Sequence, residues 1–253
     1  MRIALVQQNI IWAAPQDNRS ALDALLCGVD RPDLVVLPEM FSTGFATVPE
    51  GIAEEAPSAT LSWMKERAAK YDCAIAGSIA IHEDGRYYNR FCFVKPDGSV
   101  TQYDKRHLFT YGGEGKTFTR GEERVVVEFR GVRFLLLVCY DLRFPVWMRN
   151  RRDYDAILCV ANWPDVRRGA WDILTKARAI ENQCFFAAVN RVGADPSCKY
   201  DGGTALISPY GETLASAADG AEEVVTFEFD LQHLAEFRKK FPVLEDAENF
   251  EMI

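Results

Sequence analysis

Three residue types that together can perform acyl transfer stand at the ends of apolar, strand-like segments. Cys139 closes the run "LLLVC", Glu39 follows "DLVVLP", and Lys105 stands near the end of "VTQYDK". A thiol can act as a nucleophile, a carboxylate as a general base, and an ammonium as a fixed cation where an oxyanion develops. Taken singly, such a cysteine is more often core filler, and a glutamate or lysine more often a solvated charge. Only the combination favours an active site.

A shared strand direction would bring these residues together. In a sheet whose strands run the same way, residues at the carboxyl ends of neighbouring strands converge on one crevice. We expect Glu39, Lys105 and Cys139 to meet there. The segment after Cys139 is predicted to begin a helix, whose free N–H groups and dipole favour a thiolate and a tetrahedral oxyanion. The helix start and Lys105 are therefore predicted to keep the thiol ionised.

Apolar runs alternate with segments of helical period along the whole chain, which predicts a single α/β domain over residues 1–253. The predicted helices are 17–29 with Asp17 or Asn18 as N-cap, 58–72 capped by Ser58, 169–183, and a short helix from Leu231. The predicted strands and hairpins are 2–9, 33–40, 73–83, 87–96, 100–109, 125–139, 155–163, 184–193 and 203–216. Residues 110–123 are predicted to form a loop long enough to suggest a function.

Composition excludes several classes of function. The net charge of -8 and the pI near 5.1 argue against nucleic acid as a partner. No apolar run approaches the roughly 20 residues of a membrane span, and the N-terminus shows no signal-peptide pattern, so we expect a cytoplasmic protein. Seven irregularly spaced cysteines do not suggest a disulfide framework. Without CxxC, clustered histidines or a glycine-rich phosphate loop, we expect neither a metal site nor a nucleotide site.

The motifs around the three residues resemble those of the nitrilase superfamily of carbon–nitrogen hydrolases. "LPEMFSTGF" around Glu39, "YDKRHLF" around Lys105 and "LLLVCYDLRFPVWMRN" around Cys139 match its Glu-Lys-Cys triad in order. The segments "VANWPDVR", "WDILTKARAIENQ" and "GGTALISPYG" extend the resemblance over nearly the whole chain. The "CYDLRFPVW" block and the "KRHLF" loop are most similar to the bacterial omega-amidases.

The resemblance implies a four-layer α-β-β-α sandwich whose protomers pair through helices, as a homodimer or a higher homo-oligomer. It implies Glu39 as general base, Lys105 as oxyanion-stabilising cation, Cys139 as nucleophile, and Glu114 in "YGGEGKTF" as an assisting glutamate. The glycine-rich surroundings of Glu114 depart from the usual family version. The implied reaction hydrolyses the terminal amide of small 2-oxo acid amides, such as 2-oxoglutaramate and 2-oxosuccinamate, through a thioester. It requires no cofactor and no metal.

The sequence identifies the residues that contact the substrate less clearly than it identifies the triad. We expect the backbone N–H of Tyr140 to assist the oxyanion, and Trp163 and Phe41 to line the pocket. A substrate carboxylate needs a cationic cradle. The sequence leaves four arginines open for that part, and they are Arg143, Arg167, Arg168 and Arg191.

Three alternatives to an omega-amidase stay open at this point. A nitrilase or N-carbamoyl amidohydrolase would use the same triad. A Cys-His hydrolase would use His107, two residues from Lys105, as its base. A catalytically silent member of the superfamily would serve as a binding or scaffold module.

Overall fold

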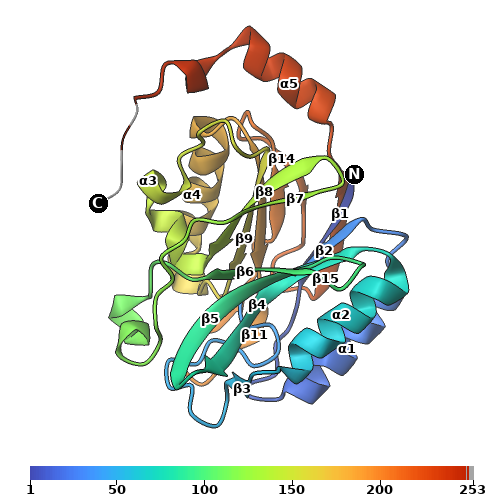
Figure 1. The fold of residues 1–253 in the computed structure, drawn as a ribbon, viewed down its shortest axis with the longest axis vertical. Helices are drawn as coiled ribbons and strands as arrows, with labels where there is room; N and C mark the ends of the chain where they lie inside the picture. Colours follow the sequence, from blue (N-terminus) through green and yellow to red (C-terminus); the bar gives the residue numbers. More distant parts are fainter. Residues whose placement is uncertain (249, 251–253) are drawn as a thin grey trace.

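The strands form two large β-sheets that pack face to face in the computed structural model, which describes residues 1–248 and 250 (Figure 1). Helices cover the outer face of each sheet. The buried aromatic rings of Phe93 in one sheet and Phe134 in the other lie 6.0 Å apart, within the core between the sheets. The order helix, sheet, sheet, helix confirms the α-β-β-α sandwich of the mixed α/β class.

The first sheet is mixed and carries the strand that precedes Glu39. Its order is β15–β1–β2–β4–β5–β6, and β3 pairs with β4. β1, β2 and β4 are parallel, whereas β5 is antiparallel to both β4 and β6. β6 therefore runs in the same direction as β2. The strands are β1 (Arg2–Gln7), β2 (Leu34–Val36), β3 (Glu54–Glu55), β4 (Ala74–Glu83), β5 (Arg86–Val94), β6 (Val100–Asp104) and β15 (Glu223–Glu228).

The second sheet carries the strand that precedes Cys139. Its order is β14–β13–β10–β9–β8–β7, with β8, β9 and β10 parallel at its centre. The buried, uninterrupted apolar runs of these central strands suit a parallel arrangement covered on both faces. A separate ribbon pairs β11 with β12. The strands are β7 (Val126–Phe129), β8 (Val132–Val138), β9 (Ala156–Ala161), β10 (Phe185–Asn190), β11 (Val192–Ala194), β12 (Lys199–Asp201), β13 (Ala205–Ile207) and β14 (Thr213–Ser216).

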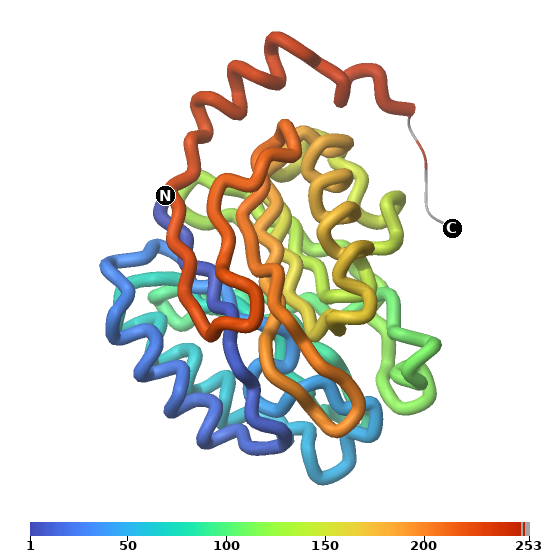
Figure 2. Tube along the Cα trace, turned by 180° about the vertical axis from the view of Figure 1, so that it is seen from behind, coloured from blue at the N-terminus to red at the C-terminus, as the bar shows by residue number. Residues whose placement is uncertain are grey.

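The edge strand β15 has no counterpart among the predicted elements. It pairs with β1 in antiparallel register from Arg2↔Glu228 to Gln7↔Glu223, and Figure 2 shows the two strands side by side. Its side chains are half-buried or exposed, and glutamates stand at both of its ends. A short edge strand of this kind gives a weak apolar signal, which explains why the sequence pattern missed it.

Helices on the two outer faces complete the layers. α1 (Pro15–Cys27) and α2 (Ala59–Tyr71) pack on the first sheet through Leu22, Met64 and neighbouring apolar residues. α3 (Pro145–Met148) and α4 (Arg168–Glu181) cover the second sheet, where Trp171 and Ala179 of α4 join the core. α5 (Leu231–Lys240) follows β15 and lies toward one end of the molecule (Figure 1). The predicted helices are therefore present, with shifted bounds.

The two predicted helix caps differ in outcome. Ser58 caps α2 as predicted, because its hydroxyl accepts the backbone N–H of Leu61 at 2.9 Å. The prediction of Asp17 or Asn18 as the cap of α1 is wrong. α1 begins earlier, at Pro15, whose fixed φ suits the first helical turn. The buried Asn18 side chain instead bridges to the backbone of Ile11.

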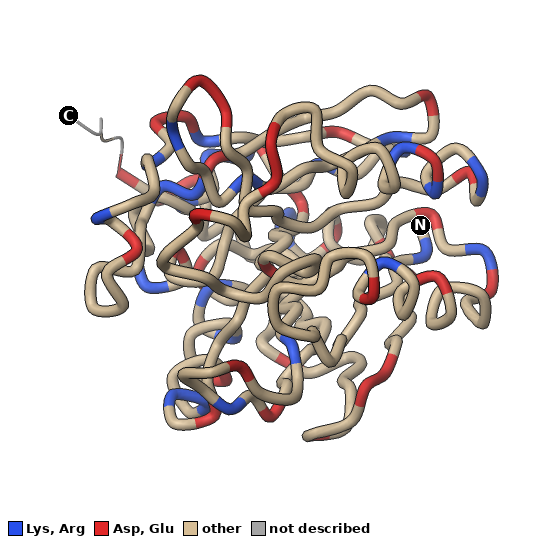
Figure 3. The backbone as a smooth tube through the Cα atoms, turned by 90° about the horizontal axis from the view of Figure 1, so that it is seen from below, with Lys and Arg blue, Asp and Glu red and all other residues tan. Residues whose placement is uncertain are grey.

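Charges of both signs are interleaved over the surface, as the adjacent blue and red segments in Figure 3 show. Many of them form ion pairs, such as Arg67 with Asp23 and Arg133 with Asp155. Within residues 1–248 and 250, no helix combines the length and the hydrophobicity needed to span a bilayer.

Candidate active site

Glu39, Lys105 and Cys139 follow strands that belong to both sheets. Glu39 lies shortly after β2 and Lys105 directly after β6. Both positions are at the carboxyl ends of strands that run in the same direction in the first sheet. Cys139 directly follows β8 in the second sheet. The expectation of one crevice is met, but the reason given for it is wrong. The residues converge across two stacked sheets, not along neighbouring strands of one sheet.

Lys105 is the centre of a buried charge cluster. Its Nζ lies 2.9 Å from Oε1 of Glu39 and 2.9 Å from Oε2 of Glu114, and none of the three side chains has exposed surface. Burial alone lowers the pKa of Lys105, but the charges of Glu114 and Glu39 outweigh burial and raise it above its ordinary value. The lysine therefore remains an ammonium. Its position is fixed by two carboxylates.

Glu114 reaches the cluster from the loop between β6 and β7. It begins the short 3-10 helix η2 (Glu114–Lys116), and its Oε2 accepts the backbone N–H of Phe109 at 2.6 Å. Burial raises the pKa of Glu114; the charge of Lys105 opposes this effect and the charge of Glu39 adds to it, and the net direction is upward. The loop predicted over 110–123 is therefore folded inward at Glu114. The glycine-rich sequence around Glu114, which departs from the usual family version, does not displace the carboxylate from Lys105.

Asn89 connects the two glutamates. This residue lies inside β5, and its Nδ2 donates to Oε1 of Glu39 at 2.7 Å and to Oε1 of Glu114 at 3.1 Å. The hydroxyl of Ser78 donates to the side-chain Oδ1 of Asn89 at 2.9 Å, which fixes the orientation of the amide. Sequence reasoning missed Asn89. A polar residue facing inward within the aromatic strand "YYNRFCF" was the available signal.

Asn162 joins the two sheets at the site. Its backbone N–H donates to Oε2 of Glu39 at 2.8 Å, and its side-chain amide donates to the Glu39 carbonyl oxygen at 2.6 Å. The carbonyl oxygen of Asn162 lies 4.0 Å from Sγ of Cys139. Asn162 was not among the predicted site residues, although it stands in the "VANWPDVR" motif, just after β9.

Cys139 occupies a strained turn and not the start of an α-helix. It has φ of 48°, in the left-handed region that non-glycine residues rarely adopt. The following element is the 3-10 helix η3 (Cys139–Arg143), and α3 begins only at Pro145. The helix predicted to begin directly after Cys139 is therefore replaced by a single tight turn, which cannot supply the dipole of a full helix.

The thiol of Cys139 is not held as a thiolate by its surroundings. Burial raises the pKa of Cys139, the charge of Glu39 raises it further, and Lys105 lowers it only in part, so that the pKa lies well above its ordinary value. This direction is opposite to the one expected from a helix start and Lys105 alone. A thiol with a raised pKa needs a base at the moment of attack.

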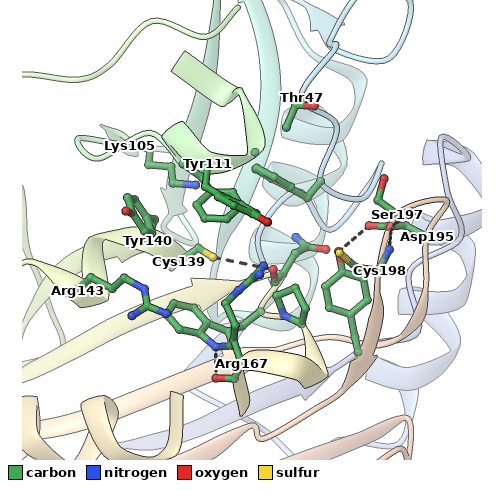
Figure 4. A pocket seen from close by; sticks show the side chains of 17 residues that line it. Thr47, Lys105, Tyr111, Cys139, Tyr140, Arg143, Arg167, Asp195, Ser197 and Cys198 are labelled. Atoms are coloured by element: carbon green, nitrogen blue, oxygen red, sulfur yellow. Dashed lines mark hydrogen bonds between the residues drawn. The ribbon is translucent and has the colours of Figure 1, made fainter. Parts of the chain in front are cut away.

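A cavity of about 230 Å³ opens beside Cys139, as Figure 4 shows. This volume is below the range of roughly 300–1,000 Å³ that is common for drug-sized ligands, so the cavity suits a small molecule. Of the predicted residues, Lys105, Cys139, Tyr140, Arg143 and Trp163 line it. The aromatic walls also include Phe45, Phe109, Tyr111 and Tyr200, which sequence reasoning missed.

The four candidate arginines divide into two pairs. Arg143 and Arg167 line the cavity, with their guanidinium groups over the rings of Trp163 and Phe109. Arg168 forms ion pairs with Asp172 and Asp219. Arg191 is fully buried and donates to backbone carbonyls, including that of Ile10 at 2.7 Å. Neither Arg168 nor Arg191 lines the cavity.

Phe41 also lies elsewhere than predicted. It is fully buried in the core between the first sheet and its helices, with its ring 6.0 Å from that of Trp63. The chain turns at Met40, whose φ is 42°, and the next side chain points to the helix-covered face of the sheet. The expectation that Phe41 lines the pocket is therefore corrected.

His107 faces away from the thiol chemistry. Its Nδ1 lies 2.8 Å from Oδ1 of Asp141, its ring stacks on Phe144 at 3.9 Å, and it does not line the cavity. Glu39, in contrast, raises the pKa of Cys139 through its charge, whereas the His107 ring is engaged by Asp141.

The chain belongs to the carbon–nitrogen hydrolase family, whose sequence profile matches residues 2–239. It is an enzyme of the amidohydrolase type. It is 43% identical to the omega-amidase YafV of Escherichia coli strain K12, over 100% of this chain and 98% of that protein. It is 35% identical to the 2-oxoglutaramate amidase of Bacillus subtilis, over 96% of each chain.

Solved structures agree with the fold and with the role of cysteine in related sites. A CN-hydrolase superfamily protein from Xanthomonas campestris, with an arsenic adduct in its active site, superposes with a TM-score of 0.96 and 42% identity, over 100% of this chain and 98% of that one. An amidase from Nesterenkonia, with acrylamide added at its active-site cysteine, has a TM-score of 0.83 and 25% identity, over 96% of this chain and 98% of that one.

Proposed function

We propose that this amidohydrolase cleaves the terminal amide of small 2-oxo acid amides, such as 2-oxoglutaramate and 2-oxosuccinamate, to the acid and ammonia. The observation that carries the proposal is the cluster of Glu39, Lys105 and Cys139 beside a cavity that also holds two arginines. In residues 1–248 and 250, neither Arg143 nor Arg167 lies within ion-pair distance of a carboxylate. Two such guanidinium groups suit a substrate that carries its own carboxylate. The names of the relatives support the same substrate class.

In the proposed mechanism, Glu39 accepts the thiol proton while Cys139 attacks the amide carbon. The oxyanion is stabilised by the ammonium of Lys105 and the backbone N–H of Tyr140. Glu39 returns its proton to the nitrogen, the C–N bond breaks, ammonia leaves, and a thioester remains on Cys139. Water then attacks the thioester with Glu39 as base, which yields the acid and restores the thiol.

In this proposal, Glu114 positions the ammonium group of Lys105. Its two oxygens lie 2.9 and 3.1 Å from Nζ, so it fixes the ammonium and shares its charge with Glu39. Trp163 and the guanidinium of Arg143, stacked at 4.8 Å, form the wall that faces the far end of the substrate. We propose Arg143 and Arg167 as the carboxylate cradle.

The decisive test is ammonia release from 2-oxoglutaramate by the purified protein and by Cys139→Ala, side by side. We expect release by the wild type alone. Release by both proteins would remove Cys139 from the mechanism. If neither protein releases ammonia, a nitrile and an N-carbamoyl amino acid are the next substrates, and their turnover would replace the proposed substrate class while retaining the triad.

We further propose a cytoplasmic homodimer. Apolar side chains are exposed along α4 and beside it, among them Ile173 at 69%, Ile180 at 52% and Tyr210 at 48% exposure. An exposed apolar surface of this kind suits contact with a second copy. Light scattering measures the mass directly, and Ile173→Lys with Ile180→Lys is expected to give the monomer.

A further inference from the structure

A buried carboxylate outside the charge cluster joins the two segments that carry Lys105 and Cys139. Asp141 lies two residues after Cys139 and has no exposed surface. Its two oxygens accept hydrogen bonds from three residues, and each oxygen has two donors. A carboxylate offers about four acceptor positions, so Asp141 is fully engaged.

The donors come from both sides of the site. Oδ2 accepts the backbone N–H of Val138 at 2.9 Å and the hydroxyl of Tyr103 at 2.7 Å. Oδ1 accepts the backbone N–H of His107 at 3.0 Å and its Nδ1–H at 2.8 Å. Val138 immediately precedes the nucleophile, whereas Tyr103 and His107 flank Lys105 at two residues on either side. One side chain therefore connects the backbones at both groups.

The donors are themselves restrained. The oxygen of Tyr103 accepts the backbone N–H of Arg106 and the indole N–H of Trp147, both at 3.2 Å. The His107 ring is parallel to that of Phe144, with 6° between the planes. A fully bonded polar network of this kind specifies a single arrangement of the segments that it connects.

We infer that Asp141 is a positioning residue that holds Lys105 and Cys139 in register, with Tyr103 and His107 as its partners. The left-handed backbone of Cys139 is costly for a cysteine and persists only where the surroundings determine it. The bond from Val138 N–H to Asp141 supplies that restraint one residue before the strained position. The inference uses the proposed function for its hydrolysis readout only, because the reactivity of the Cys139 thiol can be measured without a substrate.

Asp141→Asn tests this role with two measurements, 2-oxoglutaramate hydrolysis and alkylation of Cys139 by iodoacetamide followed by peptide mass spectrometry. An asparagine presents N–H groups to donors that need an acceptor, so the network opens. We expect kcat to fall about 100-fold with little change in KM, because a misplacement of about 1 Å has an effect of that size. Alkylation of Cys139 is expected to slow as well, since Lys105 no longer lies in register with the thiol.

Variants of His107 and Tyr103 separate positioning from acid–base chemistry. In His107→Asn the side-chain amide can donate to Asp141 in place of Nδ1, whereas His107→Ala has no donor. We expect His107→Asn to retain most of the activity, and His107→Ala and Tyr103→Phe to lose about tenfold in kcat, the effect of one hydrogen bond of about 1.4 kcal/mol. Equal inactivity of His107→Asn and His107→Ala would make the imidazole itself essential and overturn the inference.

Two controls keep the outcomes distinct. The melting temperature of each variant shows whether it is folded, and if Asp141→Asn does not fold, the His107 pair and Tyr103→Phe decide. A wild-type protein that does not hydrolyse 2-oxoglutaramate contradicts the proposed substrate, while the alkylation rates still test the network. A folded Asp141→Asn with wild-type alkylation and turnover contradicts the role of Asp141.

Discussion

The backbone N–H of Asn162 donates to Oε2 of Glu39 across 123 residues of sequence at 2.8 Å. This bond links the end of β9 in one sheet to the segment after β2 in the other. It leaves Glu39 with donors at both oxygens, because Asn89 and Lys105 donate to Oε1. The proposed base is therefore oriented by both sheets before any substrate arrives.

Glu39→Gln should separate thiol reactivity from turnover. The charge of Glu39 is one of the causes that raise the pKa of Cys139, so its removal lowers that pKa and shifts alkylation of Cys139 toward lower pH. Turnover should fall about 10³-fold, because the base and the proton donor for ammonia are lost. Alkylation rates between pH 6 and 10, measured beside ammonia release, check both directions. A shift of the alkylation profile to higher pH would contradict the electrostatic argument.

Lys105→Met should be both inactive and unstable. It leaves Glu39 and Glu114 buried without their cation, and breaking a buried ion pair in this way costs about 3–5 kcal/mol. In a chain of this size the melting temperature should fall by roughly 10 °C. Calorimetry checks this value. A melting temperature equal to that of the wild type would mean that the two carboxylates do not depend on Lys105.

Glu114→Gln should give a milder and selective defect. Lys105 keeps Glu39 as a partner, while the bond from the Phe109 N–H can still be accepted by the new amide oxygen. We expect kcat to fall about 10²-fold through a misplaced ammonium, with KM nearly unchanged, because Glu114 does not line the cavity. Steady-state kinetics decide the point. A change confined to KM would place Glu114 in substrate binding instead.

Arg143→Met and Arg167→Met should raise KM for 2-oxoglutaramate about 10- to 100-fold, since each removes a charged hydrogen bond worth about 1.5–3 kcal/mol. Turnover of butyramide, which has no carboxylate, should change little. Arg168→Met is the matched control, because Arg168 pairs with Asp172 and Asp219 away from the cavity. Equal losses on both substrates would assign the two arginines to the architecture of the pocket.

The candidate triad and Glu114 were predictable, because strand ends and short motifs are local signals. Glu39, Lys105 and Cys139 could be recognised in this way, and Glu114 through the resemblance. The contacts among them were not predictable, because they depend on the stacking of two sheets. In the sequence, Asn89 inside β5 and Asn162 after β9 look like ordinary polar residues. Their contacts with Glu39 form only when the sheets assemble and pack together.

Local patterns also misled where burial decides the outcome. Lys105 and a helix expected to begin after Cys139 suggested an ionised thiol, whereas burial and Glu39 raise its pKa. Phe41 follows a strand end, yet the backbone turn at Met40 directs it into the core. In both cases the sequence indicates which residue is near the site. The three-dimensional environment determines its charge state or its direction.

The packed rings of Phe93 and Phe134, 6.0 Å apart between the sheets, have a consequence for heat tolerance. Glu39 and Lys105 follow strands of one sheet, and Cys139 follows a strand of the other. Any shift of one sheet against the other therefore separates the nucleophile from the base. The packing of the core between the sheets sets the distance between the nucleophile and the base. A slight loosening of this core would abolish activity while both sheets remain folded. On warming, activity would therefore be lost at a lower temperature than the one at which the protein unfolds.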